Sequence, residues 1–182
     1  MHLTSHPQGR SITESEIIAQ ARRGLPEGLA GLYETHGGGL LRLATRLGGS
    51  SAEAEDLLHD LFVGLPELLG RYEHRGRLDA WLRGVMTRMV IGRIRSRRKD
   101  VSLNSAEDRS LPARPADPWN AIDLERAISR LTDTERSAFV LKLEGYSHDE
   151  IAALLGISSG ASRVRHLRAL RHLRKFLEPD NK

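Results

Sequence analysis

The chain has 182 residues, of which 39% are hydrophobic and 29% are charged, and it carries a formal net charge of +4 at pH 7. This composition is typical of a globular chain of one or two domains, and the excess of basic residues favours polyanionic partners. Because the chain has no cysteine, disulfides, thiolate chemistry and cysteine-ligated zinc are excluded. Because the polar N-terminus offers no signal peptide and no apolar run approaches the ~20 residues of a transmembrane helix, we expect a cytoplasmic protein without membrane insertion.

The first hundred residues show apolar positions at helical spacing and no alternation typical of strands. Thr13 with Glu16, and Ser50 with Glu53, are capping-box patterns that predict two helix starts. The first predicted helix begins at Thr13, the second lies over 29–47, the third begins at Ser50, and the fourth spans 79–98. Three consecutive glycines at 37–39 weaken the middle of the second helix.

The helical pattern is interrupted once and then resumes. Residues 100–118 lack periodicity and are rich in Ser, Pro, Asp and Arg, so they are predicted to be a linker. The later helices are predicted over 119–131, 132–144, 147–155 and 158–177, two of them starting with capping boxes at Thr132/Glu135 and Ser147/Glu150. The predicted fold is all-α, with two small helical domains, residues 1–99 and 119–182, joined by a flexible linker, residues 100–118.

Charge is segregated along the chain. Residues 47–70 hold five acids and no lysine or arginine, residues 71–99 hold ten bases against two acids, and residues 158–177 hold six bases and no acid. Taken alone, each run is equally well interpreted as a solvated helix face. Most of the bases are arginine, however, whose planar guanidinium suits phosphates and base edges. We therefore predict two nucleic-acid-binding helices, one in each domain.

Residues 146–158 have the pattern of a helix-turn-helix. A short capped helix is followed by Gly156, which suits a left-handed turn, and by Ile157, which returns to the core. Ser158 is placed to cap the next helix, which carries the arginines and is the expected recognition helix in a major groove. The alternative is an ordinary helical hairpin with a basic surface, but spacing, turn glycine, cap and charge together favour the helix-turn-helix.

Four segments in order carry a family resemblance. They are 16–24 with Leu32-Tyr33, 54–62 (AEDLLHDLF), Trp81-Leu82 with the arginine-rich 93–98, and 131–157 (LTDTERSAFVLKLEGYSHDEIAALLGI). Together they resemble the extracytoplasmic-function, or group IV, sigma factors of bacterial RNA polymerase. The chain departs from that family at Arg88, where Asn is common, at His59, where Gln is common, and after Gly160, where Ala161-Ser162-Arg163 replaces the frequent Val and Lys. His166-Leu167 also inverts the usual Leu-His pair.

The resemblance implies a transcription initiation factor rather than an enzyme. Such a sigma factor binds core RNA polymerase through its largest subunits and directs initiation at promoter DNA with −10 and −35 elements. It needs no cofactor, metal or small-molecule substrate. Family members are commonly held inactive by an anti-sigma factor, which adds that class of partner to the expectations.

The resemblance also assigns residues to three surfaces. The residues expected to bind core polymerase are Glu55, Asp56, Leu57, His59, Asp60 and Phe62. The residues expected at −10 DNA are Tyr72, His74, Arg75, Arg77, Arg88, Arg93, Arg95, Arg97 and Arg98. The residues expected at −35 DNA are Ser158, Ser159, Ser162, Arg163, Arg165, His166, Arg168 and Arg171.

Roles within these surfaces differ. Tyr72 and His74 are candidates for a pocket that captures an unstacked base. Arg163, Arg165 and His166 come early in the recognition helix and are expected at base edges, whereas the later arginines are expected at phosphates. For Leu57 and Phe62, packing in the core is the alternative.

Two other functional classes share part of this sequence pattern. A stand-alone helix-turn-helix regulator would share the pattern over 147–177, but it would need a receiver or ligand domain, and residues 13–98 show neither strands nor a phosphorylatable aspartate setting. A metal-dependent helical hydrolase would use His36, His59 or His74. Metal ligands normally cluster on facing helices, and no paired His-x-x-x-His or Glu-x-x-His spacing is present.

Overall fold

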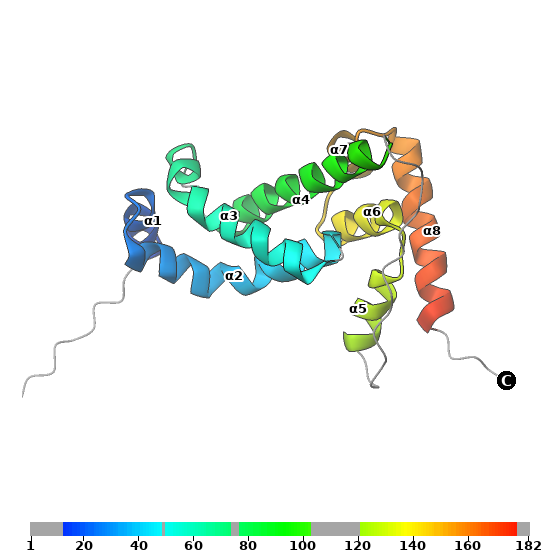
Figure 1. Cartoon of the computed structure of the whole chain (residues 1–182), viewed down its shortest axis with the longest axis horizontal. Coiled ribbons are helices and arrows are strands. Elements are labelled where there is room, and N and C mark those ends of the chain that lie inside the picture. Colours follow the sequence, from blue (N-terminus) through cyan, green and yellow to red (C-terminus); the bar gives the residue numbers. More distant parts are fainter. Residues whose placement is uncertain (1–12, 49, 74–76, 103–120, 178–182) are drawn as a thin grey trace, which may run out of the picture.

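The computed structural model describes residues 13–48, 50–73, 77–102 and 121–177, with the side chains of 98–102 and 121–123 left out. The helices in these residues are α1 Glu14–Arg22, α2 Pro26–Gly48, α3 Ser51–Gly70, α4 Leu78–Ser102, α5 Ala121–Ser129, α6 Asp133–Leu143, α7 His148–Leu155 and α8 Ser159–Leu177. No strand occurs in the part of the chain described, and the predicted all-α fold is confirmed (Figure 1).

Helices α1 to α4 form the first half of the molecule, with α2 as its central element. Helix α2 packs against α1, α3 and α4. The core between them is made mainly of leucines that are essentially inaccessible to solvent, such as Leu40, Leu61 and Leu82. Gly28 lets α2 approach α1 closely, since a Cβ there would lie only 2.4 Å from the backbone nitrogen of Ala21. The glycines at 37–39 lie within an unbroken helix, because α2 is held by neighbours along its length.

Helix starts follow the predicted caps. Complete capping boxes form at Thr13, Thr132 and Ser147. Ser50 caps α3 through its hydroxyl, which accepts from the backbone N–H of Glu53 at 3.3 Å. The reciprocal hydrogen bond of the capping box, from the Ser50 backbone to the Glu53 side chain, does not form. The carboxylate of Glu53 instead accepts a hydrogen bond from Arg97 of α4 at 2.7 Å.

The end of α4 differs from the prediction. The helix continues to Ser102, so residues 100–102, which were assigned to the linker, are helical. The rest of that predicted linker, residues 103–118, lies outside the described residues.

Helices α5 to α8 form the second half. Helix α8 packs across α5, α6 and α7. The turn between α7 and α8 has Gly156 in the left-handed conformation at φ 67°, and the Ser158 hydroxyl accepts from the N–H of Ala161 at 3.1 Å. The predicted helix-turn-helix is therefore present, with the turn glycine and the cap in their expected places.

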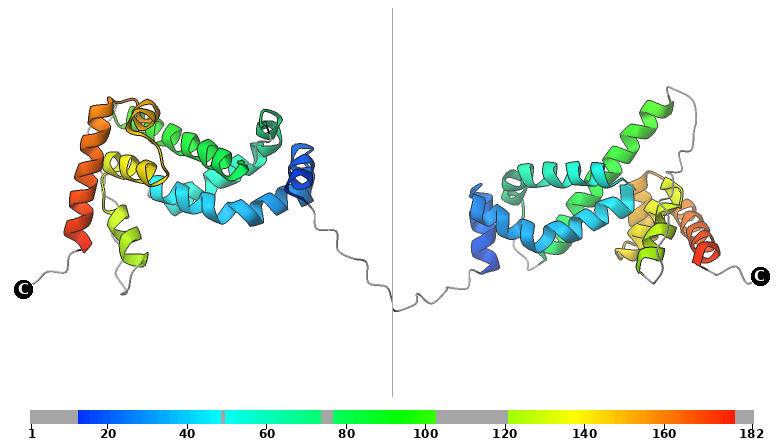
Figure 2. Two further views of the ribbon diagram at one scale, coloured as in Figure 1. Left: turned by 180° about the vertical axis from the view of Figure 1, so that it is seen from behind. Right: turned by 60° about the horizontal axis from the view of Figure 1, so that its bottom comes forward.

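The two halves are in contact. Helices α5 and α6 pack on α2, and α7 packs on α4. Ion pairs join Arg46 to Glu125 and Arg83 to Glu144 across this boundary. In the two views of Figure 2, as in Figure 1, the molecule is elongated, with α1 near one end and α8 at the other.

Candidate functional site

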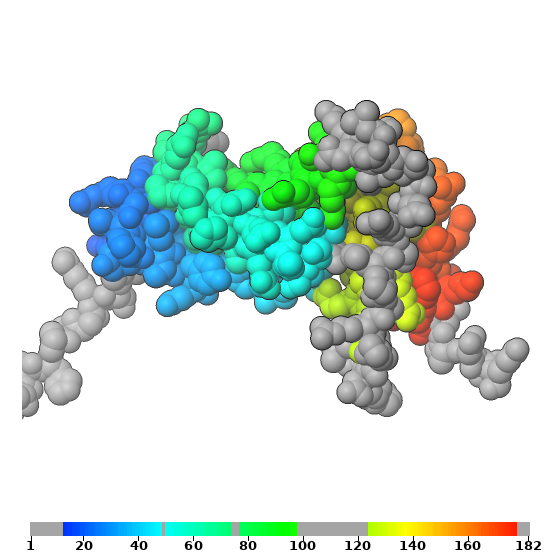
Figure 3. Space-filling view, in the orientation of Figure 1, coloured from blue at the N-terminus to red at the C-terminus, as the bar shows by residue number. Residues whose placement is uncertain are grey.

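The acidic helix α3 presents a charged face to solvent. Glu55, Asp56, His59 and Asp60 are all exposed. Asp56 and Asp60 lie four residues apart, so they share one side of the helix. This helix lies on the face of the molecule shown in Figure 3. The arrangement offers an anionic surface to a cationic partner.

An apolar hollow of about 430 Å³ adjoins this acidic face. It lies between α2 and α3 and is lined by Leu29, Ala30, Tyr33, Glu34, His59, Phe62 and Val63. Tyr33 is 52% exposed and Val63 is 67% exposed, and the Tyr33 and Phe62 rings meet edge-to-face at 5.1 Å. Among the predicted contact residues, only His59 and Phe62 line it. Tyr33 and Val63 were missed because nothing local in the sequence distinguishes an exposed apolar side chain from a core one.

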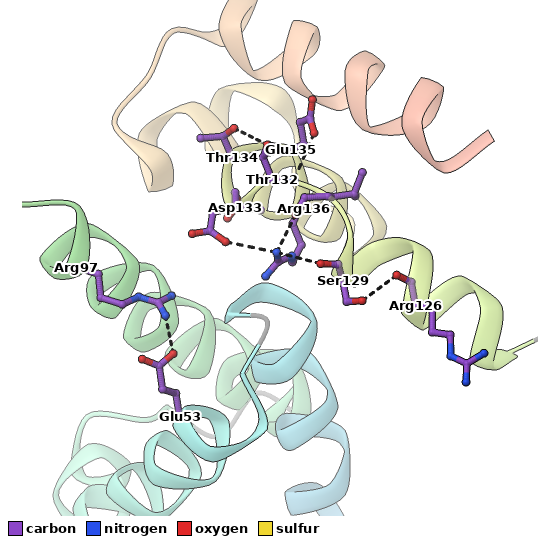
Figure 4. A network of polar contacts seen from close by, with 11 residues as sticks. Glu53, Arg97, Arg126, Ser129, Thr132, Asp133, Thr134, Glu135 and Arg136 are labelled. Carbon is purple, nitrogen blue, oxygen red and sulfur yellow. Dashed lines mark hydrogen bonds and ion pairs between the residues drawn. The ribbon is translucent and has the colours of Figure 1, made fainter. Parts of the chain in front are cut away.

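Helix α4 carries the first group of arginines. Arg88 and Arg93 are exposed on the helix, and Arg77 is exposed just before it. Two others are engaged within the molecule: Arg97 donates to Glu53 (Figure 4), and Arg95 donates to the carbonyl of Leu154 at the end of α7. His74 and Arg75 lie outside the described residues, as does the side chain of Arg98.

Helix α8 has one buried and one exposed side. Ser162, Ala169 and Leu173 form its buried stripe, with at most 4% exposure. Arg163, Arg168 and Arg171 are exposed, and α8 contains no acidic residue. All charged side chains on its exposed side are therefore cationic, as a surface that follows DNA phosphates requires.

A histidine pair lies between α7 and α8 of the helix-turn-helix. His148 at the start of α7 has its Nδ1 3.0 Å from the hydroxyl of Ser162, and its ring lies 5.8 Å from that of His166. The His166 ring also stacks on Phe139 at 5.9 Å. Burial, with a smaller contribution from His148, lowers the pKa of His166 below its ordinary value.

Arg136 on α6 is a buried arginine at the boundary between the halves. Its side chain is 2% exposed and donates to the carbonyl of Leu131 at 2.8 Å, with Asp133 at 3.4 Å. Burial lowers the pKa of its guanidinium, which Asp133 partly offsets. Figure 4 shows the guanidinium pointing from α6 toward the end of α2. This residue was not singled out from the sequence, since only the packing of α6 on α2 encloses it.

Comparison with known proteins decides the family. The family model described as Sigma-70 region 2 matches residues 32–100, and the one described as Sigma-70, region 4 matches residues 121–173. The RNA polymerase sigma factor CarQ of Myxococcus xanthus is 34% identical over 161 residues, which cover 86% of this chain and 92% of CarQ. SigL of Mycobacterium tuberculosis, an ECF RNA polymerase sigma factor, is 31% identical over 156 residues, covering 81% of this chain and 87% of SigL. The chain is an extracytoplasmic-function sigma factor.

The fold of this sigma factor agrees with solved structures. The sigma factor RpoE of Bartonella quintana, solved in complex with the anti-sigma factor NepR, superposes with a TM-score of 0.52 at 24% identity, covering 79% of this chain and 92% of RpoE. The sigma factor binds core RNA polymerase and directs initiation at promoters. The stand-alone regulator is not favoured, because a region 2 sequence precedes the helix-turn-helix.

Three predicted contact residues of the sigma factor are buried in this structure. Leu57 is 6% exposed because it belongs to the core beneath α3. Tyr72 is 7% exposed because its ring packs on Trp81 at 4.9 Å. Ser162 is fully buried because its hydroxyl meets His148. None of the three is presented to a partner in this structure.

The remaining predicted residues of the recognition helix divide in two. Ser158 is occupied as the cap of α8, and Ser159 is only partly accessible. Arg165 and His166, expected at base edges, lie on the partly buried flank of α8. The sequence could not separate this flank from the exposed side, because arginine and histidine occur on both.

Of the three histidines that a metal-dependent enzyme would use, His36 and His59 lie in the described residues and His74 does not. His36 pairs with Asp79 at 3.2 Å, whereas His59 is exposed on α3. Within residues 13–48, 50–73, 77–102 and 121–177, no group of three His, Cys, Asp or Glu side chains could hold a metal ion. Over the same residues, no helix is long and apolar enough to cross a membrane.

Proposed function

We propose that this cytoplasmic sigma factor divides its three tasks among α3, α4 and α8. The observation that carries the proposal is the separation of exposed charge, with acids on α3 and arginines on α4 and α8. A like-charged surface facing its partner would be repelled, so the acidic helix suits a protein and the basic helices suit DNA. No catalysis by the sigma factor itself is required.

The polymerase contact is assigned to the exposed side of α3. Glu55, Asp56, His59 and Asp60 supply polar contacts, and the hollow next to Phe62 supplies an apolar anchor site. Interfaces commonly combine a desolvated apolar centre with a charged rim. A helix of core polymerase with one apolar ridge flanked by basic side chains would fit both the acidic face and the apolar hollow.

The promoter contacts are assigned to the arginines of two helices. Arg77, Arg88 and Arg93 are exposed and are assigned to −10 DNA. Arg95 and Arg97 add to them when their present partners are released, and Arg98, whose side chain lies outside the described part of the chain, is assigned to the same DNA from its place in the sequence. Arg163, Arg168 and Arg171 of α8 are assigned to −35 DNA. Joining two weakly DNA-binding helices in one chain raises the effective concentration of the second at the promoter once the first is bound.

An anti-sigma factor is a further proposed partner. RpoE of Bartonella quintana was solved with the anti-sigma factor NepR, and the present sigma factor shares its fold. The exposed face of α3 is a surface that such a protein would cover to exclude polymerase. Competition between a purified anti-sigma candidate and core polymerase for the sigma factor would test this assignment.

The central experiment is co-elution of the full chain with bacterial core RNA polymerase, followed by run-off transcription from a promoter library. Stable association with transcripts that depend on both promoter elements supports the proposal. DNA binding without association with polymerase would contradict the assignment of α3. Association without any requirement for a −35 element would contradict the assignment of α8.

A further inference from the structure

The exposed side of α8 has an apolar centre. Val164 is 46% exposed and Leu167 is 52% exposed, although both lie in the N-terminal half of the helix that follows the helix-turn-helix turn. In Figure 1, α5, α6 and α7 all lie on one side of α8, which forms the outer edge of the molecule. The described elements therefore leave this apolar pair uncovered.

Helical spacing places the pair on the outermost line of α8. Val164 and Leu167 are three residues apart, and Arg171 follows four residues later, so the three side chains share one face. The buried stripe that contains Ser162, Ala169 and Leu173 lies on the opposite side. When this helix enters a groove, Val164 and Leu167 point to its floor, and the half-buried Arg165 and His166 do not.

The charges around the pair indicate which partner covers it. Arg163, Arg168 and Arg171 surround the two side chains and are exposed, and α8 contains no acid. An apolar strip between arginines matches a DNA major groove, where base edges lie between two rows of phosphates. The arginines would hold the phosphates while the apolar side chains meet the bases.

The chemistry of the two side chains restricts which base they accept. Valine and leucine neither donate nor accept hydrogen bonds, so placing them against the polar edges of guanine or cytosine leaves base groups desolvated without a partner. Thymine alone among the four bases carries a methyl group at its major-groove edge. Each methyl covered by an apolar side chain adds about a fourfold preference.

We propose that Val164 and Leu167 read thymine methyl groups in the −35 element, so that this sigma factor selects thymine at the positions facing them. The inference rests on the proposed assignment of α8 to −35 DNA. It assigns the reading of base identity at these positions to the apolar pair instead of to Arg165 and His166.

The test uses the holoenzyme and a −35 element selected from a promoter library. Each thymine of the element, on either strand, is replaced in turn by deoxyuridine, which removes only the methyl group. We expect about fourfold weaker binding at one or two positions and no change at the others. We expect Leu167→Ala to weaken binding to the thymine promoter and to abolish the difference between thymine and uracil at its position. Leu177→Ala is the matched control, because Leu177 is 45% exposed at the far end of the same helix.

Several outcomes would overturn the proposal. A selected element without thymine, or uracil substitutions without effect at every position, excludes methyl reading while leaving −35 recognition intact. Equal weakening by Leu167→Ala on thymine and uracil promoters would show a general packing or affinity role. Loss of polymerase or anti-sigma binding in Leu167→Ala, with unchanged promoter preference, would make the strip a protein-docking surface. A holoenzyme with no −35 preference at all refutes the assignment of α8 itself.

Discussion

The ion pair between Arg83 and Glu144 is expected to hold the two halves of the sigma factor together. The Nε of Arg83 donates to an Oε2 oxygen of Glu144 at 2.8 Å, and its Nη2 donates to the same oxygen. The pair joins α4 to the end of α6. We predict that Arg83→Met, which keeps much of the side-chain volume, shifts the molecule toward a state in which the halves separate.

The free-energy cost of removing this ion pair follows from the burial of its two side chains. The Glu144 side chain is 13% exposed and that of Arg83 is 31% exposed, so the pair lies between surface pairs, worth about 0.2–1 kcal/mol, and buried pairs, whose disruption costs about 3–5 kcal/mol. We expect about 2 kcal/mol, which is about a 30-fold change in the ratio of closed to open molecules. The second pair, Arg46 with Glu125, is more exposed and should contribute less.

The assay is a distance measurement between two labels. Because the chain has no cysteine, Val63→Cys on α3 and Leu177→Cys on α8 provide two unique, exposed attachment sites. The closed population should give way to an open one at lower salt in Arg83→Met than in the wild type, since salt screens the remaining ion pair. The control is Arg71→Met, which removes an ion pair with Glu67 that is exposed and lies within one half. Identical distance distributions and salt midpoints for Arg83→Met and the wild type would refute the reasoning.

Three further predictions concern binding and stability. Asp56→Ala with Asp60→Ala should weaken binding to core polymerase by about tenfold without changing the melting temperature, whereas Glu67→Ala on the same helix should leave binding unchanged; equal affinities in a titration would refute the assigned face. The pKa of His166 is lowered from 6.5, so the unfolded chain binds a proton at this histidine more readily than the folded chain as the pH falls below about 6.5, and folding stability is lost on acidification. Thermal melts between about pH 7.5 and 5.5 should therefore show a smaller loss of Tm for His166→Gln than for the wild type. Parallel curves of Tm against pH for the two proteins would contradict this. Gly156→Ala should destabilise the helix-turn-helix by about 1–2 kcal/mol, because φ is +67° at this residue; denaturant unfolding would measure it, and an unchanged midpoint would show that the turn relaxes without strain.

Local sequence rules were sufficient for the helices and insufficient for their surroundings. The caps at Thr13, Thr132 and Ser147 depend on residues three apart, so the sequence contains the whole interaction. At Ser50 the same rule predicted only half of the cap, because Glu53 has a better-placed partner in Arg97, 44 residues away. The glycine-rich middle of α2 shows the converse, since packing overrides a weak local propensity there.

The candidate site was predictable as a set of helices but less so as a set of side chains. The sequence predicted α8 to be the recognition helix, yet it could not reveal that His166 faces Phe139 or that Ser162 faces His148. Those contacts depend on how α8 crosses α6 and α7, which no local pattern specifies. The exposure of Leu167 has the same origin, because an apolar residue in a helix is by default expected in the core.

The position of Arg95 sets a competition within the molecule. Its guanidinium donates to the carbonyls of Leu154 and, at 3.4 Å, of Ala153, at the negative end of the α7 dipole. The proposed phosphate contact of the same guanidinium therefore competes with this internal one for the Nη2 group. Promoter DNA therefore competes with the α7 carbonyls for Arg95. The measured affinity of the sigma factor for promoter DNA is lowered according to the fraction of molecules in which α7 holds this arginine. Any partner that draws the halves apart thus strengthens promoter binding without touching the DNA.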